Sequence, residues 1–157
     1  MNPRTALLLA SLLFADAAAA GEADQVTASH GWIRLMPGAL PSGGYVVLEN
    51  HGDRAVALRS ASSPAYADVM LHKSSTETGM GRMESVDTLS IPAHGKAALS
   101  PGGYHLMLMK AASVVKVGDK VRVDLRFSDG STLAADFEAK PANTVDGGDM
   151  PGMEHHH

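Results

Sequence analysis

The stretch that decides the fold is KVRVDLRFSDGSTLAADFEA, residues 120–139. In its first half apolar and charged residues alternate, which gives an extended chain one apolar face and one charged face, as in a half-buried β-strand. Asp129-Gly130 follows, a dipeptide typical of tight hairpin turns. Apolar residues then return at Leu133, Ala135 and Phe137. The sequence therefore predicts a β-hairpin over residues 120–139.

Short segments of similar character, separated by turn residues, fill the chain before this hairpin. The turns are rich in Gly, Pro, Asn and Asp, as in Ser42-Gly43-Gly44 and Pro101-Gly102-Gly103. About eight short strands at such spacing predict a single all-β domain, an antiparallel sandwich or Greek-key barrel. Besides the hairpin, the expected strands are 25–35, 44–50, 55–61, 66–72, 82–91, 96–100 and 104–109.

The N-terminus has the parts of a secretory signal peptide. A basic residue precedes an apolar run from Ala6 to Phe14, and the small residues Ala17 to Ala20 follow. The run is much shorter than the ~20 residues that cross a bilayer, so we expect export to the periplasm and cleavage after Ala20. We expect the mature protein to be a soluble monomer without a membrane span. The predicted organisation is a signal peptide (1–20), one domain (21–140) and a flexible tail (141–157).

Composition argues against several functional classes. The 157 residues contain 13 Lys and Arg against 17 Asp and Glu, a formal charge of −4, so no basic surface for nucleic acid is expected. Cysteine is absent, which excludes disulfides, thiol nucleophiles and the His2Cys site of blue-copper electron carriers. No G-x-S-x-G nucleophile motif occurs, and we expect no enzymatic activity. Methionine, in contrast, is abundant, with nine residues.

Histidine and methionine share one face of two expected strands. Side chains alternate between the two faces of a strand, so leucine and valine in these strands point to the core while the His and Met residues between them point the other way. These residues are His105, Met107 and Met109 in one strand, Met70 and His72 in the other, and Met83 in the strand that follows. Two histidines and several methionines are thus expected to meet at the rim of the barrel.

The chemistry of these donors favours copper(I). A thioether is soft and neutral and suits copper(I) better than calcium, magnesium or zinc, and imidazole also binds copper. Taken singly, Met70 and Met109 are interpreted as gap-fillers of the core. Trp32 and Tyr104 are interpreted as packing residues. Three further histidines are interpreted as solvated residues, namely His30, His51 and His94.

The set His72, Met83, His105 and Met107 fits the pattern His-x10-Met-x21-His-x-Met. This pattern, together with flanking segments such as 101–109, resembles the periplasmic copper(I) chaperones of the PCuAC family over roughly residues 25–140. The resemblance implies a cupredoxin-like β-barrel with an exposed copper(I) site made by these four side chains. It also implies delivery of copper to the dinuclear copper centre of cytochrome c oxidase, beside a Sco-type protein.

The C-terminus carries a second group of donors. Met150, Met153, His155, His156 and His157 are interpreted as a possible accessory copper site, in which the histidines accept copper(II). The alternative is the remnant of an expression tag.

Three other functions stay open from the sequence. The same site suits a copper-sequestering or resistance protein of the cell envelope without an oxidase partner. An enzyme or electron carrier is disfavoured by the missing cysteine and nucleophile motif. An adhesion or interaction module of the envelope would bind no metal at all.

Overall fold

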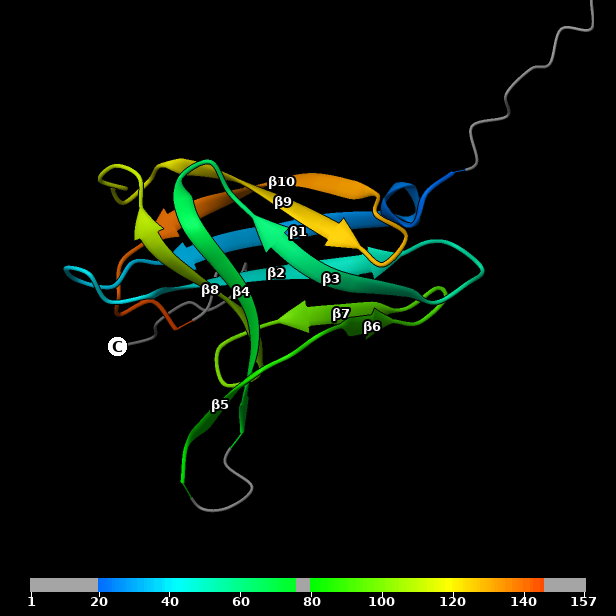
Figure 1. Cartoon of the computed structure of the whole chain (residues 1–157), viewed down its shortest axis with the longest axis horizontal. Helices are drawn as coiled ribbons and strands as arrows, with labels where there is room; N and C mark the ends of the chain where they lie inside the picture. Colours follow the sequence, from blue (N-terminus) through cyan, green and yellow to red (C-terminus); the bar gives the residue numbers. More distant parts are fainter. Residues whose placement is uncertain (1–19, 76–79, 146–157) are drawn as a thin grey trace, which may run out of the picture.

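A computed structural model describes residues 20–75 and 80–145 (Figure 1). The described chain opens with one short 3-10 turn, η1 (Glu22–Gln25), and continues through ten strands. The strands are β1 (Val26–Arg34), β2 (Ser42–Asn50), β3 (Val56–Ser62), β4 (Tyr66–Ser75), β5 (Arg82–Ser85), β6 (Leu89–Ile91), β7 (Lys96–Leu99), β8 (Tyr104–Ala111), β9 (Lys120–Phe127) and β10 (Thr132–Lys140). The predicted all-β class is confirmed.

The predicted hairpin is formed by β9 and β10, which pair antiparallel with Leu125 opposite Leu133. The apolar residues of β9 are at most 4% exposed, whereas the charged Lys120 and Arg126 face solvent. Gly130 has φ +87°, a conformation that glycine adopts without the steric cost of a side chain. The alternation and the turn dipeptide therefore specify this element locally.

One sheet holds all ten strands, in the order β5-β4-β8-β2-β1-β10-β9-β3-β6, with β7 on β2. The sheet folds over on itself, because β3 also contacts β4 and β6 contacts β7, and Figure 1 shows β4 and β8 running steeply across β1 and β2. One pairing differs from the expected antiparallel arrangement, since β1 and β10 are parallel. β5 and β6 are the two edge strands of this sheet, which is therefore open and not a closed barrel.

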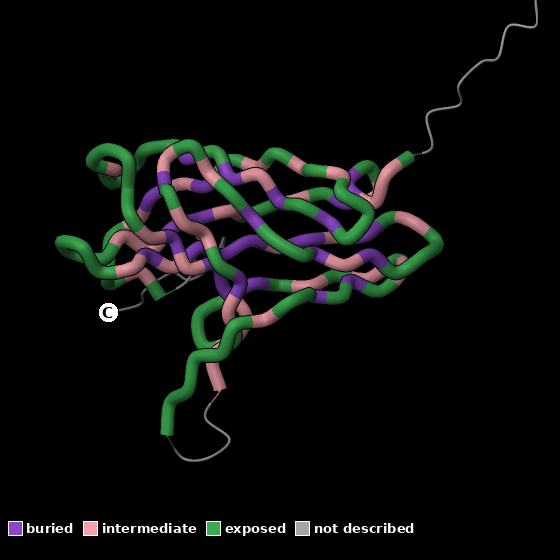
Figure 2. Tube along the Cα trace, viewed as in Figure 1, coloured by how far each residue is buried: buried purple, intermediate pink, exposed green. Residues whose placement is uncertain are grey.

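The core lies between the folded parts of the sheet and appears as the buried, purple segments of Figure 2. Its largest fully buried side chains include Phe127, Phe137, Leu106 and Leu108. Burial of such a side chain contributes about 1.5–3 kcal/mol. Because Leu106 and Leu108 anchor β8 in this core, the intervening residues of β8 face the other side of the sheet.

The strand predicted over residues 82–91 is two separate strands, which corrects the sequence interpretation. β5 pairs with β4, whereas β6 pairs with β3 in another part of the molecule. Between them the Val86 amide donates to the carbonyl of Leu71 at 2.9 Å. As a result β5 and the end of β4 form an arm that projects from the body of the sheet (Figure 1), and every residue of β5 is exposed.

The predicted signal peptide, except for residue 20, and the tail beyond residue 145 lie outside the described residues. Cleavage after Ala20 and the division at residue 140 therefore stay predictions. Within residues 20–75 and 80–145 no helix is long and apolar enough to cross a membrane.

Candidate metal site

Two neighbouring strands bring the predicted histidines together. β4 and β8 pair antiparallel in a register that places His72 directly opposite His105 and Met70 directly opposite Met107. Residues directly opposite each other point to the same face, with Cβ atoms typically ~4.5–5.5 Å apart. The imidazole ring centroids are 5.9 Å apart, with the ring planes at 76°. Two residues from the first strand and two from the second therefore gather on one face.

The arm supplies the fourth predicted ligand. β5 pairs with β4 so that Ser85 is opposite His72 and Met83 is opposite Ser74. Met83 thus points to the same face as His72 and is its diagonal neighbour, a separation that long side chains bridge. Its side chain is 57% exposed. The four residues singled out by their spacing lie on three adjacent strands of one sheet.

A hydrogen bond to the backbone selects the tautomer of the neutral His105 ring. Its Nδ1 lies 3.1 Å from the carbonyl oxygen of Gly103. A carbonyl only accepts, so Nδ1 carries a hydrogen, and in the neutral ring the lone pair is then on Nε2. Nε2 is buried and has no hydrogen-bond partner. His105 therefore presents an oriented nitrogen donor, held by a backbone contact of the kind that orients metal-binding histidines.

His72 also has a buried nitrogen without a partner, its Nδ1. Its Nε2 lies 3.4 Å from the hydroxyl of Ser85, which can either donate or accept. An unsatisfied buried polar atom costs roughly 1–3 kcal/mol. Two such atoms on facing imidazoles are unfavourable for stability alone, and a shared metal ion would satisfy both.

The surroundings of His72 favour its neutral form. Burial lowers the pKa of His72 below its ordinary value of 6.5, and the proximity of His105 lowers it further. Only the neutral imidazole has a lone pair for a metal. The arrangement therefore favours the form that coordinates.

Exposure at the site differs from the sequence expectation in two ways. His105 is only 4% exposed, although a fully outward-facing ligand set was expected. The ring of His72, which lies edge-on to His105 on the same face of the sheet, contributes to this burial. Met70 is 43% exposed, so its interpretation as a core gap-filler is wrong, while Met109 is partly buried. The position of Met70 opposite Met107 depends on strand register, for which the sequence offered no signal.

The remaining candidates lie elsewhere. His30, His51 and His94 are exposed, as expected. Of these, His51 contacts the hydroxyl of Thr27 at 2.9 Å and His94 pairs with Asp53 at 2.7 Å. Trp32 is buried against Tyr45, in agreement with a packing role. The tail donors Met150, Met153, His155, His156 and His157 lie outside the described residues.

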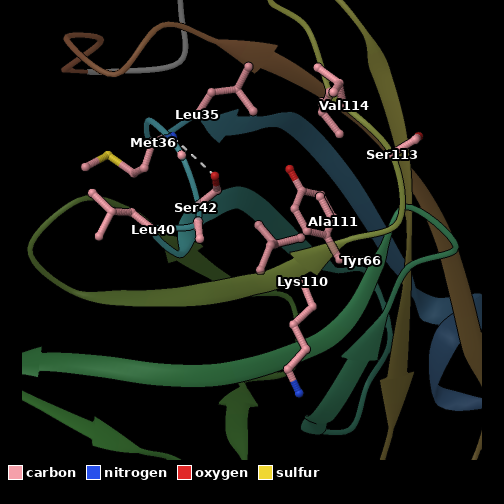
Figure 3. Close-up of a pocket in the computed structure, with 13 residues that line it drawn as sticks. Leu35, Met36, Leu40, Ser42, Tyr66, Lys110, Ala111, Ser113 and Val114 are labelled. Atoms are coloured by element: carbon pink, nitrogen blue, oxygen red, sulfur yellow. Dashed lines mark hydrogen bonds between the residues drawn. The ribbon is translucent and has the colours of Figure 1, made fainter.

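A pocket of about 720 Å³ lies at the opposite end of β8 (Figure 3). Its lining is mostly aliphatic, and it contains a single thioether, that of Met36, and no histidine. The Met36 amide donates to the Ser42 hydroxyl at 3.2 Å, as the dashed line in Figure 3 shows. This pocket lacks the mixed nitrogen and sulfur donors of the site at His72 and His105.

Comparisons with known proteins agree with this architecture. The family model described as "Putative lipoprotein LpqE-like" matches residues 26–139. A relative from Leifsonia xyli subsp. xyli, "Putative lipoprotein Lxx21020", is 34% identical over 112 residues, which are 71% of this chain and 67% of that protein.

Solved structures extend the comparison. The copper(I) form of DR1885 from Deinococcus radiodurans is 31% identical with a TM-score of 0.59, over 78% of this chain and 79% of that one. Its apo form is 29% identical with a TM-score of 0.58, over 90% and 94%. The copper-bound PCuAC domain of PmoF2, at 20% identity, supports the fold alone, with a TM-score of 0.62 over 74% and 93%. The chain belongs to the LpqE-like family, and its predicted resemblance to the PCuAC domains, with their cupredoxin-like β-fold, is confirmed.

Proposed function

We propose that this protein binds one copper(I) ion through His72, Met83, His105 and Met107 and passes it to another protein. One observation carries the proposal. Two facing imidazoles each hold a buried nitrogen without a partner, on the face of the sheet that also presents Met83 and Met107. The copper(I)-bound form of DR1885, at 31% identity, supports the copper-binding part of the proposal.

The donor set favours the monovalent ion. Two neutral imidazoles and two thioethers add no charge to the site, and thioether sulfur is a soft ligand. A divalent ion would leave two uncompensated charges beside the buried ring of His105, which is costly in a poorly solvated environment. Copper(I) leaves only one.

The depth of the four ligands suits release to an acceptor. His105 is buried, whereas Met83 is 57% exposed on the projecting arm. An acceptor that approaches from solvent reaches the Met83 sulfur first and replaces the ligands stepwise, from the arm inwards. The ion keeps its oxidation state in such an exchange, so the proposed activity is transfer without catalysis.

The destination of the ion follows from the resemblance. We propose that the protein acts in the cell envelope, in the periplasm, because its relatives are named lipoproteins and residues 1–20 have a signal-peptide pattern. The proposed acceptor is the dinuclear copper centre of cytochrome c oxidase, reached directly or beside a Sco-type protein. The tail histidines are a proposed accessory site for copper(II).

Anaerobic copper(I) titration against a competing chelator tests the binding step. The chain should take up one high-affinity equivalent, and its affinity should fall in His105→Ala and in Met107→Leu. His51→Ala and Met36→Leu are matched controls, because these residues lie away from the site, and both should retain that equivalent. Equal affinities in all four variants would refute the proposed ligands.

Incubation of the loaded protein with the isolated copper-free oxidase domain then tests delivery, since a sequestering protein would retain its copper.

A further inference from the structure

Two further methionines, Met70 and Met109, extend the site along the same face. Met70 lies opposite Met107, and Met109 follows two residues after Met107, so all three thioethers point the same way from β4 and β8. We propose that Met70, Met107 and Met109 form a second copper(I) position, free of histidine, through which the ion enters or leaves the site at His72 and His105. This inference rests on the proposed function and adds a route to it.

The spacing of the strands permits three sulfur atoms to meet. Directly opposite residues have Cβ atoms ~4.5–5.5 Å apart, and diagonal neighbours are ~7–8 Å apart. Met107 is the direct neighbour of Met70, and Met109 is its diagonal neighbour. Methionine has three rotatable bonds before its methyl group, so its sulfur adapts to a shared ligand without movement of the backbone.

Packing does not account for these methionines. On β8 the core positions are filled by Leu106 and Leu108, which are at most 1% exposed. Met70 is 43% exposed, and Met109 is only partly buried. Both border the same open pocket of about 450 Å³, together with residues at the end of β3 and the start of β4. An ion in this pocket would therefore be accessible to both sulfur atoms and to solvent.

The charge around this pocket favours a monovalent soft ion over a hard divalent one. The one carboxylate that lines it belongs to Asp68, which lies opposite Met109. That carboxylate is already paired with the Lys110 ammonium at 2.7 Å. With this charge compensated, the available donors are neutral thioethers, which select copper(I) or silver(I).

Met107 belongs to both positions, and this shared ligand defines the transfer step. The ion exchanges the two imidazole nitrogens and the Met83 sulfur for the sulfurs of Met70 and Met109, while its bond to Met107 persists. Three bonds break and two form, so the ion passes from four donors to three neutral thioethers, and copper stays monovalent throughout. No proton or electron needs to be supplied.

Methyl-resolved NMR of the full chain, with ¹³C at the methionine methyl groups, tests the second position. Silver(I) serves as an air-stable monovalent probe, followed by copper(I) under anaerobic conditions. In the double variant His72→Ala/His105→Ala one equivalent should still shift the signals of Met70, Met107 and Met109. The Met36 signal should not move, and tail methionines report separately.

A second variant keeps the test decisive if the double histidine variant does not fold. Met70→Leu/Met109→Leu conserves side-chain volume and should leave the first equivalent in place. It should slow copper(I) removal by a soluble chelator about tenfold, the change expected when ~1.4 kcal/mol of stabilisation is lost along the route.

The outcomes separate this inference from the proposed function. If Met83 and Met107 respond in the unaltered chain but Met70 and Met109 remain silent through two equivalents, the second position does not exist and the first stands. An unchanged removal rate in Met70→Leu/Met109→Leu likewise overturns the route. If none of the four methionines responds, the proposed function itself fails.

Discussion

His72 on β4 lies directly opposite His105 on β8, with ring centroids 5.9 Å apart and the ring planes at 76°. Each ring has one buried nitrogen without a hydrogen-bond partner. In the copper-free protein this arrangement is a local cost, because two polar atoms are withdrawn from water and nothing replaces their hydrogen bonds. The same arrangement is suitable for an ion that bridges the two rings.

Replacement of His105 by leucine should separate stability from binding. The change removes a buried unsatisfied nitrogen, and the Gly103 carbonyl keeps its other partner, the Ser74 amide at 3.0 Å. We therefore expect the free energy of unfolding of the copper-free protein to be unchanged or higher by up to ~1 kcal/mol, while copper(I) binding is lost. Urea denaturation measures this, with Leu106→Ala as a control that should cost about 2–5 kcal/mol. A marked destabilisation by His105→Leu would assign the residue a structural role instead.

Met83→Leu should weaken copper(I) binding with little effect on the fold. The side chain is 57% exposed on β5, so its substitution should alter the free energy of unfolding by no more than about 0.5 kcal/mol. Loss of one thioether should reduce affinity about tenfold, or ~1.4 kcal/mol. Met80→Leu is the matched control, because Met80 precedes the same strand and is 75% exposed. Equal affinities for the two variants would remove Met83 from the ligand set.

Copper(I) affinity should depend on pH in a defined direction. Burial, and to a smaller extent His105, lowers the pKa of His72 below its ordinary 6.5. This ring therefore stays mostly neutral as the pH is lowered from 8 to 6.5. Protonation of His72 should therefore not limit affinity over this range. At lower pH protons compete for the imidazoles, and affinity should fall by up to about tenfold per pH unit for each histidine that titrates. A constant affinity down to pH 5 would point to a site of methionines alone.

The lowered pKa of His72 can be checked directly in the copper-free protein. Titration of the His72 ring protons by NMR should give a midpoint below 6.5, because desolvation disfavours the charged ring. A midpoint above 6.5 would show that the ring is solvated or paired with an anion, contrary to its surroundings in the structure.

Local sequence patterns predicted those parts of the fold that form between residues close together in the sequence. The β9–β10 hairpin is encoded by alternation and by Asp129-Gly130, both of which act within twenty residues. The segment 82–91 was predicted as one strand, because its division depends on pairing of its halves with different partners, β4 and β3. The parallel pairing of β1 with β10 joins distant segments and is equally invisible to periodicity.

The candidate site was likewise predicted from the sequence only in part. Alternation placed His105 and Met107 on one face, and the spacing of four residues linked them to His72 and Met83. Sequence alone did not indicate that Met70 would lie opposite Met107, because one residue of register slip changes every cross-strand partner. Nor did it indicate that His105 would be buried at 4% exposure, which depends on the strand packed beside it.

X-ray absorption at the copper edge, on protein loaded anaerobically with less than one equivalent of copper(I), tests the ligand set most directly. The account predicts a first shell that contains both nitrogen and sulfur neighbours, with the nitrogen contribution reduced in His72→Ala/His105→Ala and the sulfur contribution reduced in Met83→Leu/Met107→Leu. A shell that is the same in all three proteins would place the metal elsewhere in the chain and contradict the account.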